Sequence, residues 1–349
     1  MMGEDSHRDG VRSRRRVLVR PCVCDWRESK IMSDSKTRVG LASGNDRRGN
    51  VFAALDLVRE EVIPRIADQV LLSPNFLSAA SQVVCTHADA IRGAIDFLSS
   101  VPEPPAEIVV AEGANEKYSG EAFDNFGYRS LAGEYDIPIR LVDLHGETEW
   151  EEIPILLDDR SEVSARMPRL VLDCPCVFSV AVAKTHDVTV VTLALKNLIM
   201  GSIHKEDRIR MHGFPTHAAR TLPAEAQTLN INLIRVARRL CPDIGIVDGT
   251  VGIQGNGPGG TDVVDFGAVA ASADVFAADA VAAKAMGFEP LELGFLRYAE
   301  ELGLGVADLE RIEVMGASLD AVTCRFKPHE SIDQQLQWHD ERAGELLQV

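Results

Sequence analysis

The chain of 349 residues is long enough for one large α/β domain, or for two lobes, around a sizeable core. Its 46% hydrophobic and 26% charged residues are typical of a globular protein, and no apolar run reaches the ~18 residues of a bilayer-spanning helix. A formal net charge of −17 argues against a nucleic acid or an anionic membrane as the partner.

The first 31 residues are rich in arginine and carry no hydrophobic periodicity, whereas the segment after Met32 leads directly into the apolar run 39–42. This contrast favours Met32 as the natural start of the protein. We therefore expect residues 1–31 to be a mis-called extension or a disordered tail. A native peptide that spans Cys22 and Cys24 would contradict the first alternative.

From residue 37 onward, short β-like runs alternate with segments of helix length. The pattern predicts strands over 38–42, 70–72, 107–111, 139–144, 169–172, 177–183, 244–247 and 311–314. It predicts helices over 51–63, 88–98, 223–240, 272–286 and 291–302. Thr86 is the predicted N-cap of the helix over 88–98, and Asp274 that of the alanine-rich helix over 272–286.

Alternation of this kind predicts an α/β fold with a mostly parallel sheet and helices on both faces. We expect residues 37–316 to form this single domain, although a division into two lobes stays open. Residues 328–349 are predicted to be a polar C-terminal tail. The seven cysteines are odd in number and no secretory signal is evident, so we expect a cytoplasmic protein with reduced thiols.

The cysteine spacing also bears on cofactors. Cys22/Cys24 and Cys174/Cys176 are C-x-C pairs, which fit neither a ferredoxin run nor a zinc ribbon. We therefore expect no iron–sulfur cluster of the chain's own.

Positive charge gathers between Lys184 and Arg220, against the acidic trend of the whole chain. Six lysines and arginines face three aspartates and glutamates in this window, a local excess of three, and four of the nine histidines lie there too. Cations concentrated in an acidic protein predict an anionic ligand, such as a carboxylate or a phosphate.

Lys184 and His186 follow an apolar run, where the predicted strand ends. Functional groups of open α/β sheets lie at the carboxyl ends of strands, so this placement favours a site. If residues 188–200 form a helix, Thr192 and Lys196 share one of its faces. Lys196 would then be withdrawn from water, which lowers the pKa of a lysine and suits a base or an anion anchor.

Plainer interpretations stay open. A lysine after a strand is usually a surface residue, and scattered histidines are usually unrelated. His212 and His217 are five residues apart and do not share a helix face, and no H-E-x-x-H motif occurs. The candidates for a histidine-bound divalent metal are His186 and His204.

A glycine-rich segment follows the strand predicted over 244–247. Gly255, Gly257 and Gly260 satisfy G-x-G-x-x-G, but the residues that follow, 261–271, are β-like rather than helical, which argues against a dinucleotide site. The loop is either a pocket wall, with Asp248 as a polar contact, or a structural turn between strands.

Several motifs resemble one family. Lys184-Thr185-His186, Thr192, Lys196-Asn197, Gly201 and His204 resemble the signature of the uncharacterised domain of unknown function 362. Further similar motifs are Thr86-His87 with Ala90-Ile91-Arg92, Asp248-Gly249 with Gly255-x-Gly257-Pro258, and Ser272-x-Asp274 through Asp279 to Met286-Gly287.

The resemblance covers roughly residues 38–316 and implies an α/β domain, often found with ferredoxin-type iron–sulfur modules. This chain departs from that pattern, since it has no cysteine array for a cluster. It also has Ser73-Pro74-Asn75 where the family often shows Lys-Pro-Asn, which leaves Asn75 as the contact. The resemblance implies a location and a fold, and no reaction.

The leading hypothesis is an enzyme that acts on a small anionic substrate, with or without a divalent metal. Its catalytic candidates are Lys184, His186 and Lys196, and Glu112 is a further polar residue at an element end. The ligand-binding candidates are Asn75, His87, Thr192, Asn197, His204, Asp248, Gly255 and Gly257. The alternatives are a non-catalytic metal- or cofactor-binding protein that partners a ferredoxin-type protein in trans, and a binding module without turnover. Whether the chain is an enzyme stays open.

Overall fold

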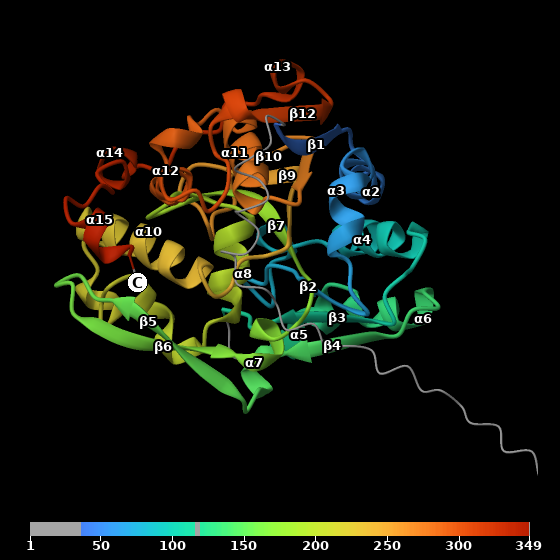
Figure 1. Cartoon of the computed structure of the whole chain (residues 1–349), viewed down its shortest axis with the longest axis horizontal. Coiled ribbons are helices and arrows are strands. Elements are labelled where there is room, and N and C mark those ends of the chain that lie inside the picture. The colour runs from blue at the N-terminus through green and yellow to red at the C-terminus, as the bar shows by residue number, and fades with distance from the viewer. Residues whose placement is uncertain (1–35, 116–118, 349) are drawn as a thin grey trace, which may run out of the picture.

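A mixed sheet of ten strands runs through the computed structural model, which describes residues 36–115 and 119–348 (Figure 1). The predicted N-terminal extension, 1–31, lies outside the described residues. The order of the main strands is β12 (Ile312–Gly316), β1 (Thr37–Ser43), β11 (Ala268–Ser272), β9 (Ile244–Ile253), β7 (Val177–His186), β2 (Gln69–Ser73), β3 (Glu107–Glu112) and β4 (Ile139–Asp143).

Most neighbouring strands are parallel, and only β11 among these eight is antiparallel to its neighbours. Two short strands pair antiparallel with longer ones, β8 (Val190–Thr192) with β7 and β10 (Val263–Val264) with β9. A separate antiparallel hairpin consists of β5 (Trp150–Leu156) and β6 (Glu162–Pro168). The α/β class and the mostly parallel sheet predicted from the sequence are confirmed.

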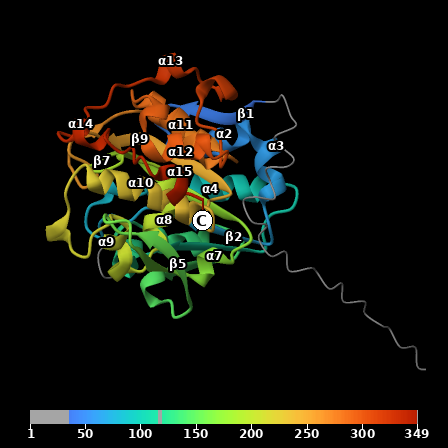
Figure 2. The same cartoon turned by 60° about the vertical axis from the view of Figure 1, so that its left-hand side comes forward.

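Helices cover both faces of the sheet, as predicted (Figures 1 and 2). One face packs against α2 (Arg47–Leu57), α4 (Ala88–Ser100), α5 (Ser119–Asn125) and α6 (Leu131–Glu134), with α3 (Arg59–Val62) beside α2. The other packs against α8 (Ala194–Ser202), α10 (Ala224–Ala237), α11 (Val275–Ala285) and α12 (Gly294–Glu301). Among the residues described, no helix is both long and apolar enough to cross a membrane.

Local sequence explains these elements. Strand β3 is buried on both faces and accordingly carries the continuous apolar run Ile108–Ala111. Helix α4 buries Ile91, Ala94, Ile95 and Leu98, which recur at helical spacing and face the core. Asp274 caps α11 as predicted, because its carboxylate accepts the backbone N–H groups of the first turn.

Two local predictions are wrong, and a helix considered over residues 188–200 does not form. Residues 169–172 form a helical turn, α7 (Arg169–Leu172), rather than a strand, since three apolar residues after an arginine are too few to show a period. Residues 188–200 do not form one helix, because the chain first turns back into β8. The N-cap of α4 is His87 rather than Thr86, whose hydroxyl donates to the carbonyl of Val180 at 2.7 Å.

The C-terminal segment, predicted as a polar tail, packs against the domain. It contains α14 (Ile332–Gln335) and α15 (Ala343–Leu346), after α13 (Leu319–Val322). Leu346 and Leu347 are buried, and the Leu346 carbonyl accepts a hydrogen bond from the Arg235 guanidinium of α10 at 2.8 Å. The segment thereby places His329 and Ser331 near Asp187 and residues 217–225, in the middle of the sequence.

Candidate functional site

Two buried side chains meet where strand β7 ends. Lys196 Nζ, on α8, lies 2.9 Å from Nε2 of His186, the last residue of β7. The two residues are only 5% and 4% exposed. The structure thus brings two of the three predicted catalytic residues into direct contact.

Hydrogen bonds around His186 assign its tautomer. Its Nδ1 accepts the backbone N–H groups of Val188 at 3.0 Å and Thr189 at 3.3 Å, so the proton of the neutral ring sits on Nε2. This N–H points at Lys196, whose amine accepts a hydrogen bond only when it is neutral. Burial lowers the pKa of Lys196 to about 8 and, with the nearby Lys196, holds the pKa of His186 well below its usual value.

A buried carboxylate holds the start of the helix that carries Lys196. Asp279 of α11 accepts the backbone N–H groups of Ala194 at 2.7 Å and Leu195 at 3.0 Å, which have no partner within the helix. The side chain is fully buried, and burial raises the pKa of Asp279 to about 7. Asp279 therefore fixes the position from which Lys196 reaches His186.

Asn197 ties the same helix to strands β2 and β7. Its Nδ2 donates to the Ser73 carbonyl of β2 at 3.1 Å and to Ser179 Oγ of β7 at 3.0 Å. Its Oδ1 is buried without a hydrogen-bond partner in the described part of the chain. The predicted ligand residue Asn197 thus retains one unused acceptor beside the site.

Lys184 and Asn75, both predicted as site residues, also meet. Lys184 Nζ donates to Asn75 Oδ1 at 2.5 Å and to the Val84 carbonyl at 2.7 Å, and the residue is 1% exposed. Burial lowers the pKa of Lys184 to about 8. Lys184 is therefore an interior lysine bound to neutral oxygens rather than a surface residue.

Thr192 does not share a helical face with Lys196, because the helix over 188–200 on which that depended does not form. It lies in β8, opposite Lys184 in the β7–β8 ladder. The chain reverses directly after His186, so α8 begins only at Ala194. The Thr192 hydroxyl is buried and has no hydrogen-bond partner among the described residues.

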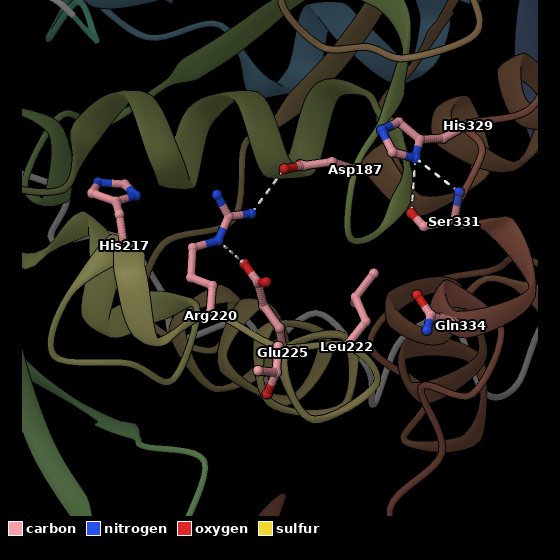
Figure 3. A pocket seen from close by; sticks show the side chains of 9 residues that line it. Asp187, His217, Arg220, Leu222, Glu225, His329, Ser331 and Gln334 are labelled. Carbon is pink, nitrogen blue, oxygen red and sulfur yellow. Dashed lines mark hydrogen bonds and ion pairs between the residues drawn. The ribbon is translucent and has the colours of Figure 1, made fainter.

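A polar pocket of about 490 Å³ has Asp187, the residue that follows His186 in the chain, in its wall (Figure 3). Arg220 lies between two of its carboxylates, donating to Asp187 Oδ2 at 2.8 Å and to Glu225 Oε1 at 2.6 Å. Its lining is Asp187, His217, Arg220, Thr221, Leu222, Glu225, His329, Ser331 and Gln334.

His212 connects this pocket to the buried pair. Its Nδ1 lies 2.5 Å from Glu225 Oε1, and its ring stacks on that of His186 with centroids 6.5 Å apart. Burial lowers the pKa of His212. The spacing of His212 and His217 excluded a shared helix face. The fold nevertheless brings both to this pocket, with His217 in its wall and His212 behind Glu225.

Sequence reasoning missed Asp187 and Glu225, because acidic residues counted only as offsets to positive charge. A usable signal was present in part, since Asp187 directly follows His186. No sequence signal marked Glu225, because it lies in a predicted amphipathic helix where polar residues are expected on the exposed face.

Other predicted residues have separate partners. His87 caps α4 by accepting the Asp89 N–H at 3.1 Å. Asp248 forms an ion pair with Arg47 at 2.7 Å. His204 packs edge-on against Trp150, with ring centroids 4.8 Å apart.

The predicted metal pair also divides, since His186 contacts Lys196 and His212 whereas His204 contacts Trp150. Within residues 36–115 and 119–348, no group of three or more His, Cys, Asp and Glu side chains is arranged to hold a metal ion. A metal bound by His186 and His204 stays a prediction.

The glycine-rich loop covers the carboxyl end of β7. Thr185 Oγ1 donates to the Gly255 carbonyl at 2.9 Å, and Gly255 has a positive φ of 69° that favours glycine. The backbone of Gly257 lies so close to Thr185 that a Cβ there would be 2.3 Å from its carbonyl oxygen. The loop thus packs tightly onto the strand that ends in His186.

Gly257→Ala is expected to lower the free energy of unfolding by about 1–3 kcal/mol, because backbone must move to admit the methyl group. Urea unfolding measures the loss. Gly259→Ala is the matched control, since the nearest atom to its Cβ would be Leu77 Cδ2 at 3.9 Å. Equal stability of the two variants would contradict the close packing of the loop.

Comparison with known proteins places these residues in a family. The family model described as Domain of unknown function (DUF362) matches residues 70–284. The thylakoid-associated protein sll1697 of Synechocystis sp. is 26% identical over 280 residues, which are 76% of this chain and 78% of that protein. A lactate racemase apoprotein structure from Thermoanaerobacterium thermosaccharolyticum has a TM-score of 0.38 and 11% identity, over 69% of this chain and 54% of that chain.

Proposed function

We propose that this chain, which belongs to the DUF362 family, is an enzyme that moves a proton on a small anionic substrate. The substrate is a carboxylate or a phosphate, held in the pocket beside Arg220. The observation that supports this proposal most directly is the 2.9 Å contact between Lys196 and His186, two buried titratable groups behind the pocket wall.

The pair suits acid–base chemistry near neutral pH. A lysine whose pKa lies at about 8 is present both as a neutral amine, which takes up a proton, and as an ammonium ion, which returns it. The buried Lys184 lowers the pKa of Lys196 further by charge repulsion, as two neighbouring amines do in other lysine-based active sites. In this proposal Lys184 is a positioning residue, held by Asn75.

Asp187 connects the pair to the pocket. It follows His186 in the chain, its Oδ1 lies 3.1 Å from His186 Nδ1, and its Oδ2 accepts from Arg220. The guanidinium can bind the anionic group of a substrate and stabilise negative charge that develops when a neighbouring C–H is deprotonated. Substrate binding at Arg220 and proton transfer at the Lys196–His186 pair would thus occur within one contiguous group of polar side chains.

Incubation of the protein with a panel of small carboxylates in deuterated water tests this proposal. We expect NMR to show exchange of a C–H hydrogen beside the carboxylate for deuterium. The C–H proton passes to the lysine amine, and a deuteron from the solvent-exchanged ammonium ion returns to the carbon. Lys196→Met should slow this exchange at least about 100-fold, because proton transfer by a positioned group contributes that much.

Lys205→Met is the matched control, since Lys205 lies in the same charged window but is exposed. Binding of small phosphates, measured by calorimetry, tests the other anion class. If no carboxylate or phosphate binds, the proposal fails. Metal analysis of protein purified without oxygen tests the predicted divalent metal. A metal or an iron–sulfur protein that co-purifies with a chain lacking any exchange activity would favour the non-catalytic alternative.

A further inference from the structure

The charges that line the pocket do not match a simple anion. Two carboxylates, Asp187 and Glu225, flank the single guanidinium of Arg220 (Figure 3). Glu225 is 3% exposed, so its charge is held in the wall rather than dissipated in water. With a whole-chain charge of −17, a purely anionic ligand also meets long-range repulsion.

The flanking carboxylates each retain an acceptor. Asp187 Oδ1 faces His186 Nδ1 at 3.1 Å, but that nitrogen already accepts two backbone N–H groups and cannot donate. Glu225 uses only Oε1 for its bonds to Arg220 and His212, and in the described part of the protein no hydrogen bond reaches Oε2. Each of these oxygens can therefore accept a hydrogen bond from a ligand in the pocket.

The guanidinium retains a donor as well. Arg220 uses Nε for Glu225 and Nη2 for Asp187, which leaves Nη1 for a ligand oxygen among the described contacts. The pocket therefore offers one cationic donor beside two anionic acceptors. A cavity of about 490 Å³ admits a molecule of a few to a dozen heavy atoms.

We infer that the substrate is zwitterionic, an α-amino acid or a close relative, with its carboxylate on Arg220 and its ammonium group on Asp187 and Glu225. This inference rests on the proposed function, since it places the same substrate anion in the same pocket. It adds that a positively charged nitrogen is required for recognition. A zwitterion has no net charge, so the acidic surface does not repel it.

Calorimetry with three matched sets of probes tests the inference. The sets are the twenty common α-amino acids, the carboxylic acids that lack the amino group, and the amines that lack the carboxylate. We expect at least one amino acid to bind about tenfold or more tightly than both of its truncated relatives, because a site built for a polar group rejects the analogue without it.

Variants separate the two charges. Asp187→Asn should remove the advantage of the amino acid over its des-amino relative, and Glu225→Gln should do the same if Asp187→Asn fails to fold. Glu206→Gln is the control, since Glu206 is exposed and pairs with Arg166 and His204. Arg220→Gln should remove the tighter binding of the amino acid relative to the amine that lacks its carboxylate.

Each other outcome is decisive. If the des-amino acids bind as tightly as the amino acids, the zwitterion is wrong while the proposed anion site stands. If amines alone bind equally well, the anion site on Arg220 is wrong and the proposed function fails with it. If no probe of any set binds, the zwitterion is wrong, and the proposed function fails with it unless a small phosphate binds in the separate calorimetry.

Discussion

Replacement of Asp279 by alanine is expected to lower the free energy of unfolding by about 2–6 kcal/mol, because it leaves two buried N–H groups without an acceptor. These are the N–H groups of Ala194 and Leu195, at the start of helix α8. Because α8 carries Lys196, the variant should also lose the Lys196–His186 contact. Urea unfolding measures the stability, and histidine NMR reports the environment of the His186 ring.

Asp279→Asn keeps the shape and one acceptor, but its amide NH₂ would face the second backbone N–H. Asp279→Asn should therefore lower the free energy of unfolding less than Asp279→Ala does, by about 1–3 kcal/mol for the one N–H group left unpaired. Asp320→Ala is the control for removal of an exposed aspartate on a short helix. A stability of Asp279→Ala equal to that of Asp320→Ala would show that the carboxylate does not hold the helix.

The second large effect concerns pH and Glu112, at the carboxyl end of β3. Glu112 Oε1 accepts the Phe76 N–H at 3.0 Å, while Oε2 is buried without a hydrogen-bond partner in the residues described. Burial raises the pKa of Glu112 from 4.5 to about 8. The folded state therefore binds this proton more tightly than the unfolded chain does.

The stability that this proton provides is fully present below about pH 4.5 and is lost as the pH rises through about 8. The free energy involved is on the order of 3–5 kcal/mol. Glu112→Gln carries no titratable proton and keeps an acceptor for Phe76, so we expect the stability of this variant to fall much less between pH 5 and pH 8. Urea unfolding across that range gives the change in the free energy of unfolding with pH for the native chain and for Glu112→Gln.

Other buried titratable groups also change the stability with pH. Burial also raises the pKa of Asp279, which adds to the slope of both proteins and cancels in their difference. Lys184 and Lys196 act in the opposite direction, because their lowered pKa values add stability only as the pH rises from about 8 towards 10.5. Glu310→Gln, at an exposed position, is the control. Identical slopes for Glu112→Gln and the native chain would contradict a proton held on Glu112.

Much of the candidate site could be predicted from local sequence. The excess of positive charge between Lys184 and Arg220 singled out the segment that contains the Lys196–His186 contact. The apolar run that ends at Lys184 placed that segment at the carboxyl end of a strand, where the structure has it. Local periodicity was informative because buried strands and amphipathic helices need apolar residues at their own spacings.

Partners distant in the sequence could not be predicted in this way. Lys184 bonds to Asn75, 109 residues away, and Asp279 caps a helix that begins 85 residues before it. No local pattern distinguishes Glu225, in the middle of the chain, or His329, near its end, as residues of the same pocket wall. The strand predicted over 169–172 failed for a related reason, since a short apolar run suits either element until its neighbours are known.

The sequence alone determined the α/β class, the alternation of elements and the charged segment from Lys184 to His217, because each depends on residue type and spacing along the chain. The tertiary structure decided which charges are buried, which are paired and which meet. It withdrew Lys184 and Lys196 from water and set Lys196 against His186. Burial then lowered the pKa values of both lysines, and that depends on surroundings supplied by the whole fold.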